Sequence, residues 1–84
     1  MHPQVEKQIF KFLDTIPPKQ KAQIAIKILE LFRDPRPHDS IQLKGSVVDF
    51  RVDIGEYRVI YSFTAKDGVT ILKVDKRNDG QVYR

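Results

Sequence analysis

Residues 50–63 read FRVDIGEYRVIYSF, and this stretch decides the fold. Apolar and polar residues alternate on both sides of Gly55-Glu56, which is the pattern of two half-buried strands. A glycine that opens a two-residue connection suits a type II′ hairpin turn. This turn pairs Asp53 with Arg58 and places both of them on one face of the sheet with Arg51.

A third strand is predicted at residues 69–75, where β-branched and apolar residues indicate a central position in the sheet. Asp67-Gly68 precedes it and predicts a two-residue type I′ turn. The resulting register pairs Phe63 with Leu72, Tyr61 with Val74, Ser62 with Lys73 and Arg58 with Arg77. A row of charged residues, Asp53–Arg58–Arg77, then runs across three strands.

The two turns divide the sheet into an apolar face that accepts helices and a charged face. The apolar face comprises Phe50, Val52, Ile54, Tyr57, Val59, Tyr61, Phe63, Leu72 and Val74. The charged face comprises Arg51, Asp53, Arg58, Lys73, Asp75 and Arg77. Like charges directly opposite each other destabilise a sheet, so Arg58 beside Arg77 has two interpretations. Either the two aspartates neutralise the arginines, or the arginines bind an anion such as phosphate, which suits the planar guanidinium.

Upstream of the strands, the apolar period is that of helices. Residues 3–16 carry one apolar stripe, and Pro17-Pro18 ends this first helix. A second helix runs from Pro18 to about Arg33 and is apolar on a broad arc. Its predicted core-facing residues are Ala22, Ala25, Ile26, Leu29 and Phe32, widened by Ile24, Ile28 and Leu31. The short connection predicts an antiparallel helical hairpin. The fold class is therefore α+β, with the hairpin packed on one face of an antiparallel β-meander, and residues 81–84 add a short last strand.

Composition limits the function. The 84 residues suffice for a single domain, 1–84, and the net charge of +4 favours an anionic partner. Cysteine is absent, and His2 and His38 lie far apart as exposed bystanders, so no disulfide, thiolate nucleophile, metal site or cofactor is expected. No apolar run is long enough to span a membrane and no signal peptide is evident, so a cytoplasmic location is expected.

The chain resembles the RelE/ParE toxin superfamily of bacterial toxin–antitoxin systems. The resemblance rests on Leu43-Lys44-Gly45, on the 50–61 stretch with its string GEYRVIY, on Val74-Asp75-Lys76-Arg77 and on the terminal Val82-Tyr83. It implies a small toxin that a cognate antitoxin neutralises, with a helical hairpin followed by a meander. For the RelE branch it implies ribosome-dependent cleavage of mRNA.

The resemblance also implies roles for single residues. Arg58 and Arg77 match phosphate-contacting arginines, and Arg51 matches a basic active-site position. Tyr83 matches an aromatic residue that stacks on a base or, as a second choice, transfers a proton. As a phenol with a reference pKa of about 10, Tyr83 is better suited to stacking. Lys44, Lys73 and Lys76 are expected to contact RNA.

Two features depart from the family pattern. Asp53 stands where a second basic residue is usual, so we interpret it as a modulator that pairs with Arg58 or accepts a proton. The first edge strand of the family is also missing from the prediction, because the chain begins almost at a helix.

Two functions follow. The leading hypothesis is an endoribonuclease in which a 2′-hydroxyl attacks the adjacent phosphate while Arg51, Arg58 and Arg77 stabilise the charge. The alternative is a non-catalytic ParE-like toxin that inhibits DNA gyrase by protein binding. In either case an acidic or amphipathic segment of the antitoxin is expected to cover the basic face or the helical hairpin. The ribosome and mRNA are partners only under the first hypothesis.

Overall fold

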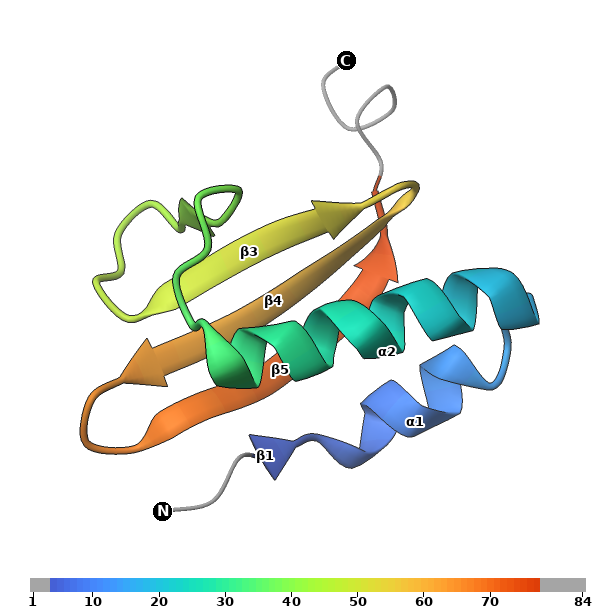
Figure 1. Ribbon diagram of the computed structural model, residues 1–84, viewed down its shortest axis with the longest axis horizontal. Coiled ribbons are helices and arrows are strands. Elements are labelled where there is room, and N and C mark those ends of the chain that lie inside the picture. Colours follow the sequence, from blue (N-terminus) through green and yellow to red (C-terminus); the bar gives the residue numbers. More distant parts are fainter. Residues whose placement is uncertain (1–3, 78–84) are drawn as a thin grey trace.

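Two helices and a five-stranded sheet make up the fold in the computed structural model, which describes residues 4–77 (Figure 1). The elements are β1 (Gln4–Val5), α1 (Lys7–Leu13), α2 (Pro18–Arg33), β2 (Ile41–Gln42), β3 (Asp49–Ile54), β4 (Tyr57–Thr64) and β5 (Gly68–Lys76). The strand order is β1-β5-β4-β3-β2, and all neighbours are antiparallel except β1 and β5. The predicted α+β class and the central position of the third predicted strand, β5, are confirmed.

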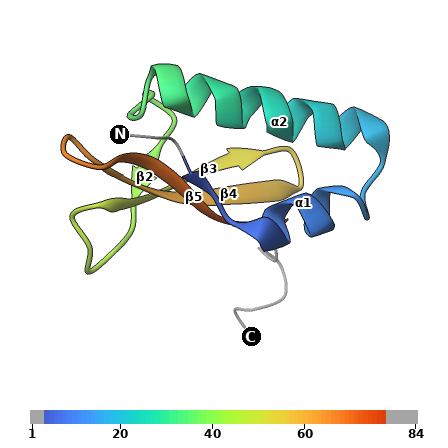
Figure 2. The same ribbon diagram turned by 90° about the horizontal axis from the view of Figure 1, so that it is seen from below.

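The helix α2 lies over one face of the sheet, whereas α1 packs beside β5 (Figure 2). The bounds predicted for α2 are confirmed, but its predicted core-facing residues are confirmed only in part. Ile24, Ile28 and Leu31 are buried, while Ile26 and Leu29 are 56% and 66% exposed. The helix is apolar over an arc wider than the sheet can cover, so the sequence pattern could not show which part of the arc faces inward.

A short N-terminal strand corrects the prediction that the first edge strand is missing. Gln4 pairs with Thr70 and Val5 with Ile71, parallel to β5, and the Glu6 amide donates to the Ile71 carbonyl at 3.2 Å. The first helix accordingly begins at Lys7 rather than within residues 3–6. Two residues are too few to show the period-2 pattern by which a strand is recognised, and β2 escaped prediction for the same reason.

The β3–β4 hairpin has the predicted register. Ile54 pairs with Tyr57 and Asp53 with Arg58. Gly55 has a φ of +56°, and no non-glycine residue within 4–77 has a positive φ. Glu56 therefore has a negative φ, as the second residue of a type II′ turn requires.

The β4–β5 hairpin differs from the prediction. Thr64 pairs with Gly68, so three residues rather than two connect the strands, and the positive φ of 74° falls on Gly68. A type I′ turn needs a positive φ at both central residues, so the predicted turn is wrong. Asp-Gly fits both arrangements, since longer connections built on a type I turn are also commonly followed by a left-handed glycine, which here is the first residue of β5.

A β-bulge then shifts the register a second time. Tyr61 pairs with Ile71 and Ile60 with Lys73, which leaves Leu72 as the extra residue of β5. The predicted pairs of Phe63, Ser62 and Tyr61 are replaced by Phe63–Val69, Ser62–Thr70 and Tyr61–Ile71.

The core lies between the sheet and the helices. Its buried side chains from the sheet are Phe50, Val52, Tyr57, Val59, Tyr61, Val69, Ile71 and Val74. Leu72, predicted as core, is only partly buried, because the bulge removes it from the strand alternation. The Tyr61 hydroxyl donates to the Pro35 carbonyl at 2.7 Å, which ties the segment after α2 to the sheet.

Candidate anion-binding site on the open face of the sheet

The face of the sheet opposite the helices carries the charged residues; we call it the open face. Strand alternation puts Arg51 and Asp53 of β3 on this face, since Phe50 and Val52 beside them are buried. Arg58 of β4 stands directly opposite Asp53. The pairing across the Gly55-Glu56 turn thus brings side chains of β3 and β4 together, as predicted.

Three arginines converge on the Asp53 carboxylate. Arg51 Nη1 donates to both carboxylate oxygens at 3.2 Å, and Arg58 Nε donates to Oδ1 at 3.1 Å. Arg77 Nε lies 3.7 Å from Oδ2. We call Arg51, Arg58 and Arg77 the arginine cluster.

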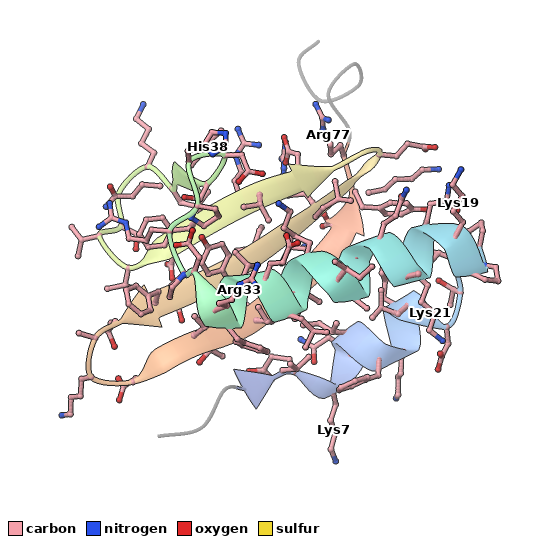
Figure 3. All side chains as sticks on the ribbon, viewed as in Figure 1. Lys7, Lys19, Lys21, Arg33, His38 and Arg77 are labelled. Atoms are coloured by element: carbon pink, nitrogen blue, oxygen red, sulfur yellow. The ribbon has the colours of Figure 1, made fainter. Side chains whose placement is uncertain are left out.

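Arg77 reaches this position from just beyond the end of β5 (Figure 3). Its amide donates to the Glu56 carbonyl at 2.7 Å, and its Nη1 donates to the Gly55 carbonyl at 3.1 Å. Backbone carbonyl oxygens of the β3–β4 turn therefore hold Arg77 in place. This anchoring does not depend on the side chains of the turn residues.

The predicted pairing of Arg58 with Arg77 is wrong, because the shifted ladder sets Arg58 opposite Asp75. Arg58 and Arg77 meet at Asp53 instead of side by side on the ladder. Asp75 in turn pairs with Lys73 at 3.2 Å. The neutralising role proposed for the two aspartates is thus partly present, since each carboxylate contacts cationic side chains.

Neutralisation is incomplete among the described residues around Asp53. On the open face, Arg51, Arg58, Arg77 and Lys73 supply four cations against the three carboxylates of Asp49, Asp53 and Asp75, which leaves one positive charge in excess. The arginine side chains are 25%, 24% and 34% exposed, so solvent and ligands reach them. Guanidinium groups remain charged at any relevant pH and match the geometry of phosphate oxygens. This arrangement can bind an anion.

The structure separates the other predicted site residues. Lys73 lies on the open face opposite Ile60, close to the arginine cluster. Lys76 stands opposite the buried Tyr57, hence on the helix side of the sheet, and pairs with Glu56 at 3.5 Å. Lys44 is exposed in the loop between β2 and β3. Tyr83 lies outside the described residues, as does the strand predicted at residues 81–84.

Within residues 4–77, histidine does not contribute to the arginine cluster. His38 is exposed between α2 and β2 and is well separated from Arg77 in Figure 3. His2 lies outside the described residues. Within residues 4–77, a proton acceptor in the cluster would have to be the Asp53 carboxylate, which already accepts hydrogen bonds from arginines.

Two groups with altered acidity lie in or beside the segment after α2. A hydrogen bond from Lys27, at 3.1 Å, lowers the pKa of Asp39. Burial raises the pKa of Tyr61 above its usual value of about 10. Asp39 joins the segment after α2 to the helix and Tyr61 joins it to the sheet, so we assign both groups to stability.

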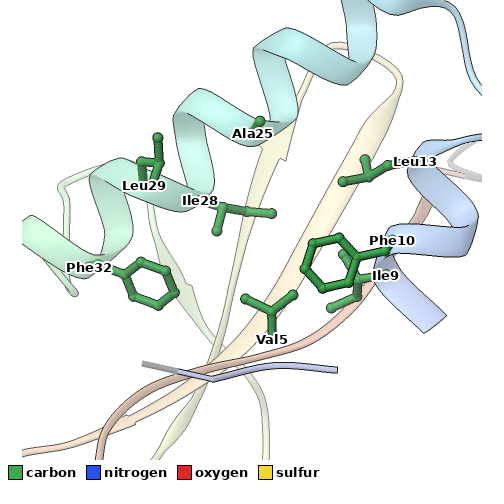
Figure 4. Close-up of a pocket in the computed structure, with 8 residues that line it drawn as sticks. All are labelled: Val5, Ile9, Phe10, Leu13, Ala25, Ile28, Leu29 and Phe32. Atoms are coloured by element: carbon green, nitrogen blue, oxygen red, sulfur yellow. The ribbon is translucent and has the colours of Figure 1, made fainter. Parts of the chain in front are cut away.

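A second surface, which sequence reasoning missed, lies between the helices. A cavity of about 260 Å³ is lined by apolar side chains of β1, α1 and α2 (Figure 4). Phe10 and Leu29 contribute to it and are 58% and 66% exposed. The sequence signal was available, because Phe10 lies off the apolar stripe of the first helix and Leu29 lies on the excess apolar arc of the second. We call this surface the helical groove.

No helix of the described chain is long and apolar enough to cross a membrane. Comparison with curated proteins gives no match.

The solved structures with this fold include RelE toxins and their complexes. The archaeal RelE–RelB complex from Pyrococcus horikoshii matches with a TM-score of 0.79 and 31% identity, over 92% of this chain and 94% of that one. The toxin–antitoxin complex RelBE2 of Mycobacterium tuberculosis matches with a TM-score of 0.73 and 24% identity, over 89% and 95% of the two chains. The isolated E. coli RelE toxin matches with a TM-score of 0.77 and 19% identity, over 96% and 88%. The last two likenesses concern the fold alone.

The sequence itself matches the family described as the ParE toxin of the type II toxin–antitoxin system parDE, over residues 1–80. That match covers nearly the whole chain and agrees with the helix-then-meander fold of the RelE structures. The chain therefore belongs to the ParE toxin family and is a toxin of a type II toxin–antitoxin system in the RelE/ParE superfamily.

Proposed function

We propose that this toxin is a ribosome-dependent endoribonuclease that cleaves mRNA at the open face of its sheet. The observation that carries the proposal is the convergence of Arg51, Arg58 and Arg77 on one point of the described sheet. A fixed group of guanidiniums can bind the scissile phosphate and stabilise the charge that builds on its oxygens.

In the proposed reaction, the 2′-hydroxyl of one nucleotide attacks the adjacent phosphorus. The 2′-oxygen forms a bond to phosphorus, the bond to the 5′-oxygen of the next nucleotide breaks, and a cyclic 2′,3′-phosphate results. The attacking hydroxyl loses a proton and the leaving oxygen gains one. Arg58 and Arg77 stabilise the phosphoryl oxygens and Arg51 orients the phosphate, while Lys73 on the same face steers the strand.

Proton transfer is the weak part of this site, because a guanidinium is a poor base at neutral pH. Catalysis then depends mainly on holding the 2′-hydroxyl in line with the leaving oxygen. A ribosome that fixes the message in its decoding site supplies this alignment, which is the physical reason for the proposed ribosome dependence. We propose Tyr83 as a stacking partner for a base.

A second candidate is inhibition of DNA gyrase by protein contact, without catalysis. The ParE family match favours it, and so does Asp53, which occupies the arginines that the ribonuclease needs. Under this alternative the arginine cluster serves at most as part of a protein-binding surface.

Induction of the toxin in bacteria separates the two functions. We expect wild-type toxin to produce codon-phased 5′ ends in mapped mRNA, and Arg58→Ala and Arg77→Ala to lose them together with growth arrest. Removal of one charge-stabilising donor lowers a rate by about 10²–10³-fold. Lys66→Ala is the matched control, because it also removes one cation but lies exposed in the connection between β4 and β5, at the opposite end of β4 from Arg58.

Intact messages together with DNA damage would refute the ribonuclease and favour gyrase. Full toxicity of both arginine variants would refute the proposed site. Thermal unfolding of each purified variant shows whether a loss of activity reflects loss of the fold.

We further propose that the antitoxin docks an amphipathic helix in the helical groove. The groove is apolar throughout its lining, and Leu29 is shared with a neighbouring hollow lined by Ile26 and Arg33. The solved RelE–RelB complexes contain an antitoxin beside a toxin of the same fold. Apolar helices commonly bind such grooves through residues three and four apart.

Leu29→Asp tests this docking. The side chain is 66% exposed, so the substitution changes stability by about 0.5 kcal/mol or less. We expect cells with the variant to remain growth-arrested when the antitoxin is co-expressed, because a carboxylate is then buried at the interface. Unimpaired rescue by the antitoxin would place its essential contacts elsewhere, with the open face as the remaining candidate.

A further inference from the structure

Asp53 occupies the point on the open face where the three arginines converge. Its two carboxylate oxygens accept hydrogen bonds from Arg51 and Arg58 at 3.1–3.2 Å, and Arg77 Nε lies 3.7 Å from Oδ2. The carboxylate is 28% exposed, so it lies at the surface rather than in the core. It therefore occupies N–H donors of the arginine cluster that an approaching anion would also use.

A carboxylate and a phosphodiester present similar groups to an arginine. Each carries one negative charge spread over two oxygens, and each accepts paired N–H donors of a guanidinium. Two such anions cannot share one binding point, because like charges about 4 Å apart repel strongly even near a protein surface. An RNA phosphate that binds these same donors must therefore move Asp53 aside or draw the arginines away from it.

We infer that Asp53 is an intramolecular competitor that occupies the phosphate site of the free toxin and lowers its affinity for RNA. The inference rests on the proposed function, since it names what limits access of an RNA phosphate to the arginine cluster. Asp53 is here a positioning residue, because it acts through the arginines rather than on the reacting atoms.

The competition has a functional consequence. A toxin with exposed arginines would bind any RNA by charge alone. With Asp53 in place, stable binding requires additional contacts or an already aligned phosphate, and a message held by the ribosome supplies both. Asp53 thus favours the message on the ribosome over unstructured RNA in solution.

Binding of a 2′-O-methyl RNA of about ten nucleotides tests the inference. This RNA lacks the attacking hydroxyl, so binding is measured without cleavage. We expect Asp53→Asn to bind about ten-fold more tightly than wild type at low salt. We also expect a steeper salt dependence, because the slope of log K against log salt grows by about 0.7 for each additional phosphate that the arginines bind.

Asp67→Asn is the matched control for charge. Asp67 is exposed in the connection after Thr64, and Thr64 lies about 20 Å along β4 from Arg58 at the rise of a strand. The substitution removes the same charge but beyond the screening length of about 8–10 Å at moderate salt. We expect its affinity to change by less than about two-fold and its salt slope to match wild type. The double variant Asp53→Asn/Arg77→Ala should lose the tighter binding of Asp53→Asn.

The outcomes separate the inference from the proposed function. If Arg58→Ala and Arg77→Ala bind RNA as well as wild type, the arginine cluster is not the phosphate site and the proposed function fails. If those variants weaken binding but folded Asp53→Asn binds no more tightly than wild type, only the competition is refuted. A folded Asp53→Asn that binds more weakly also refutes it, since Asp53 then organises the arginines for RNA.

Asp53→Ser repeats the measurement with a smaller neutral side chain. Unfolding of both Asp53 variants would overturn the inference by making the carboxylate a requirement of the fold.

Discussion

Replacing Tyr61 with phenylalanine tests how the segment after α2 is held to the sheet. The ring is fully buried, and its hydroxyl donates to the Pro35 carbonyl at 2.7 Å. Tyr61→Phe keeps the ring, its packing on Ile71 across the ladder and its stacking on Phe50. It removes one hydrogen bond and leaves the carbonyl without this donor.

The expected loss is about 1–2 kcal/mol of unfolding free energy at neutral pH. For a chain of this size each kcal/mol lowers Tm by about 4–8 °C, so Tm should fall by roughly 5–15 °C. Thermal unfolding followed by circular dichroism measures this fall.

The pH dependence gives an independent check. Burial raises the pKa of Tyr61 in the folded protein, whereas the unfolded chain has the ordinary value of about 10. The unfolded chain therefore releases this proton first as pH rises. The contribution of the hydroxyl is fully present below about pH 10 and is lost as the pH rises from there to the raised folded-state value.

Urea unfolding at pH 7 to about 11 should thus show the stability difference between wild type and Tyr61→Phe shrinking above about pH 10, by at most about 1.4 kcal/mol per pH unit. A difference that stays constant up to about pH 11 would refute a buried, hydrogen-bonded hydroxyl.

Two further predictions concern α2. Ile24 is fully buried and Ile26 is 56% exposed, so Ile24→Ala should lower the unfolding free energy by about 2–4 kcal/mol and Ile26→Ala by about 0.5 kcal/mol or less. Equal losses in urea unfolding would mean that the inward-facing arc of the helix is wrongly placed. Lys27→Gln should raise the pKa of Asp39 toward its ordinary value, as observed by NMR titration of the Asp39 carboxyl. The Lys27–Asp39 pair contributes about 0.2–1 kcal/mol to the unfolding free energy. This contribution is present above the unfolded-state pKa near 3.9 and is lost as pH falls through the lower folded-state pKa of Asp39. Equal stability of wild type and Lys27→Gln at neutral pH would contradict this contribution.

Local patterns were sufficient for the two helices, the three long strands and one hairpin, but not for the two-residue strands β1 and β2. Alternation in residues 50–63 and the glycine at position 55 fixed both strands of the β3–β4 hairpin and their register, because a two-residue turn leaves no freedom in pairing. The position of Asp53 opposite Arg58, and therefore the placement of Arg51 and Arg58 in the arginine cluster, followed from sequence alone. The breadth of the apolar arc in α2 likewise indicated more apolar surface than the sheet needs.

The placement of β5 against β4 depended on tertiary structure. Asp67-Gly68 allows connections of different lengths, and the longer one exchanges the two faces of β5 near the turn. The bulge at Leu72 exchanges them again, so Val69, Ile71 and Val74 are all buried while Lys73 and Asp75 reach the open face. Burial of these apolar residues decides the register of β5 against β4, and no local sequence pattern encodes that register.

What the amino-acid sequence determined by itself was therefore the kinds of element, their order and the face on which the charges lie, since these depend on periods of two and 3.6 residues. Only the tertiary structure decided that Arg77 meets Asp53 by way of the Gly55 and Glu56 backbone rather than standing beside Arg58. The physical reason is that the residue of β5 that faces a given residue of β4 depends on the length of their connection and on the bulge between them. Both of these are set by burial of apolar side chains and not by a local sequence pattern.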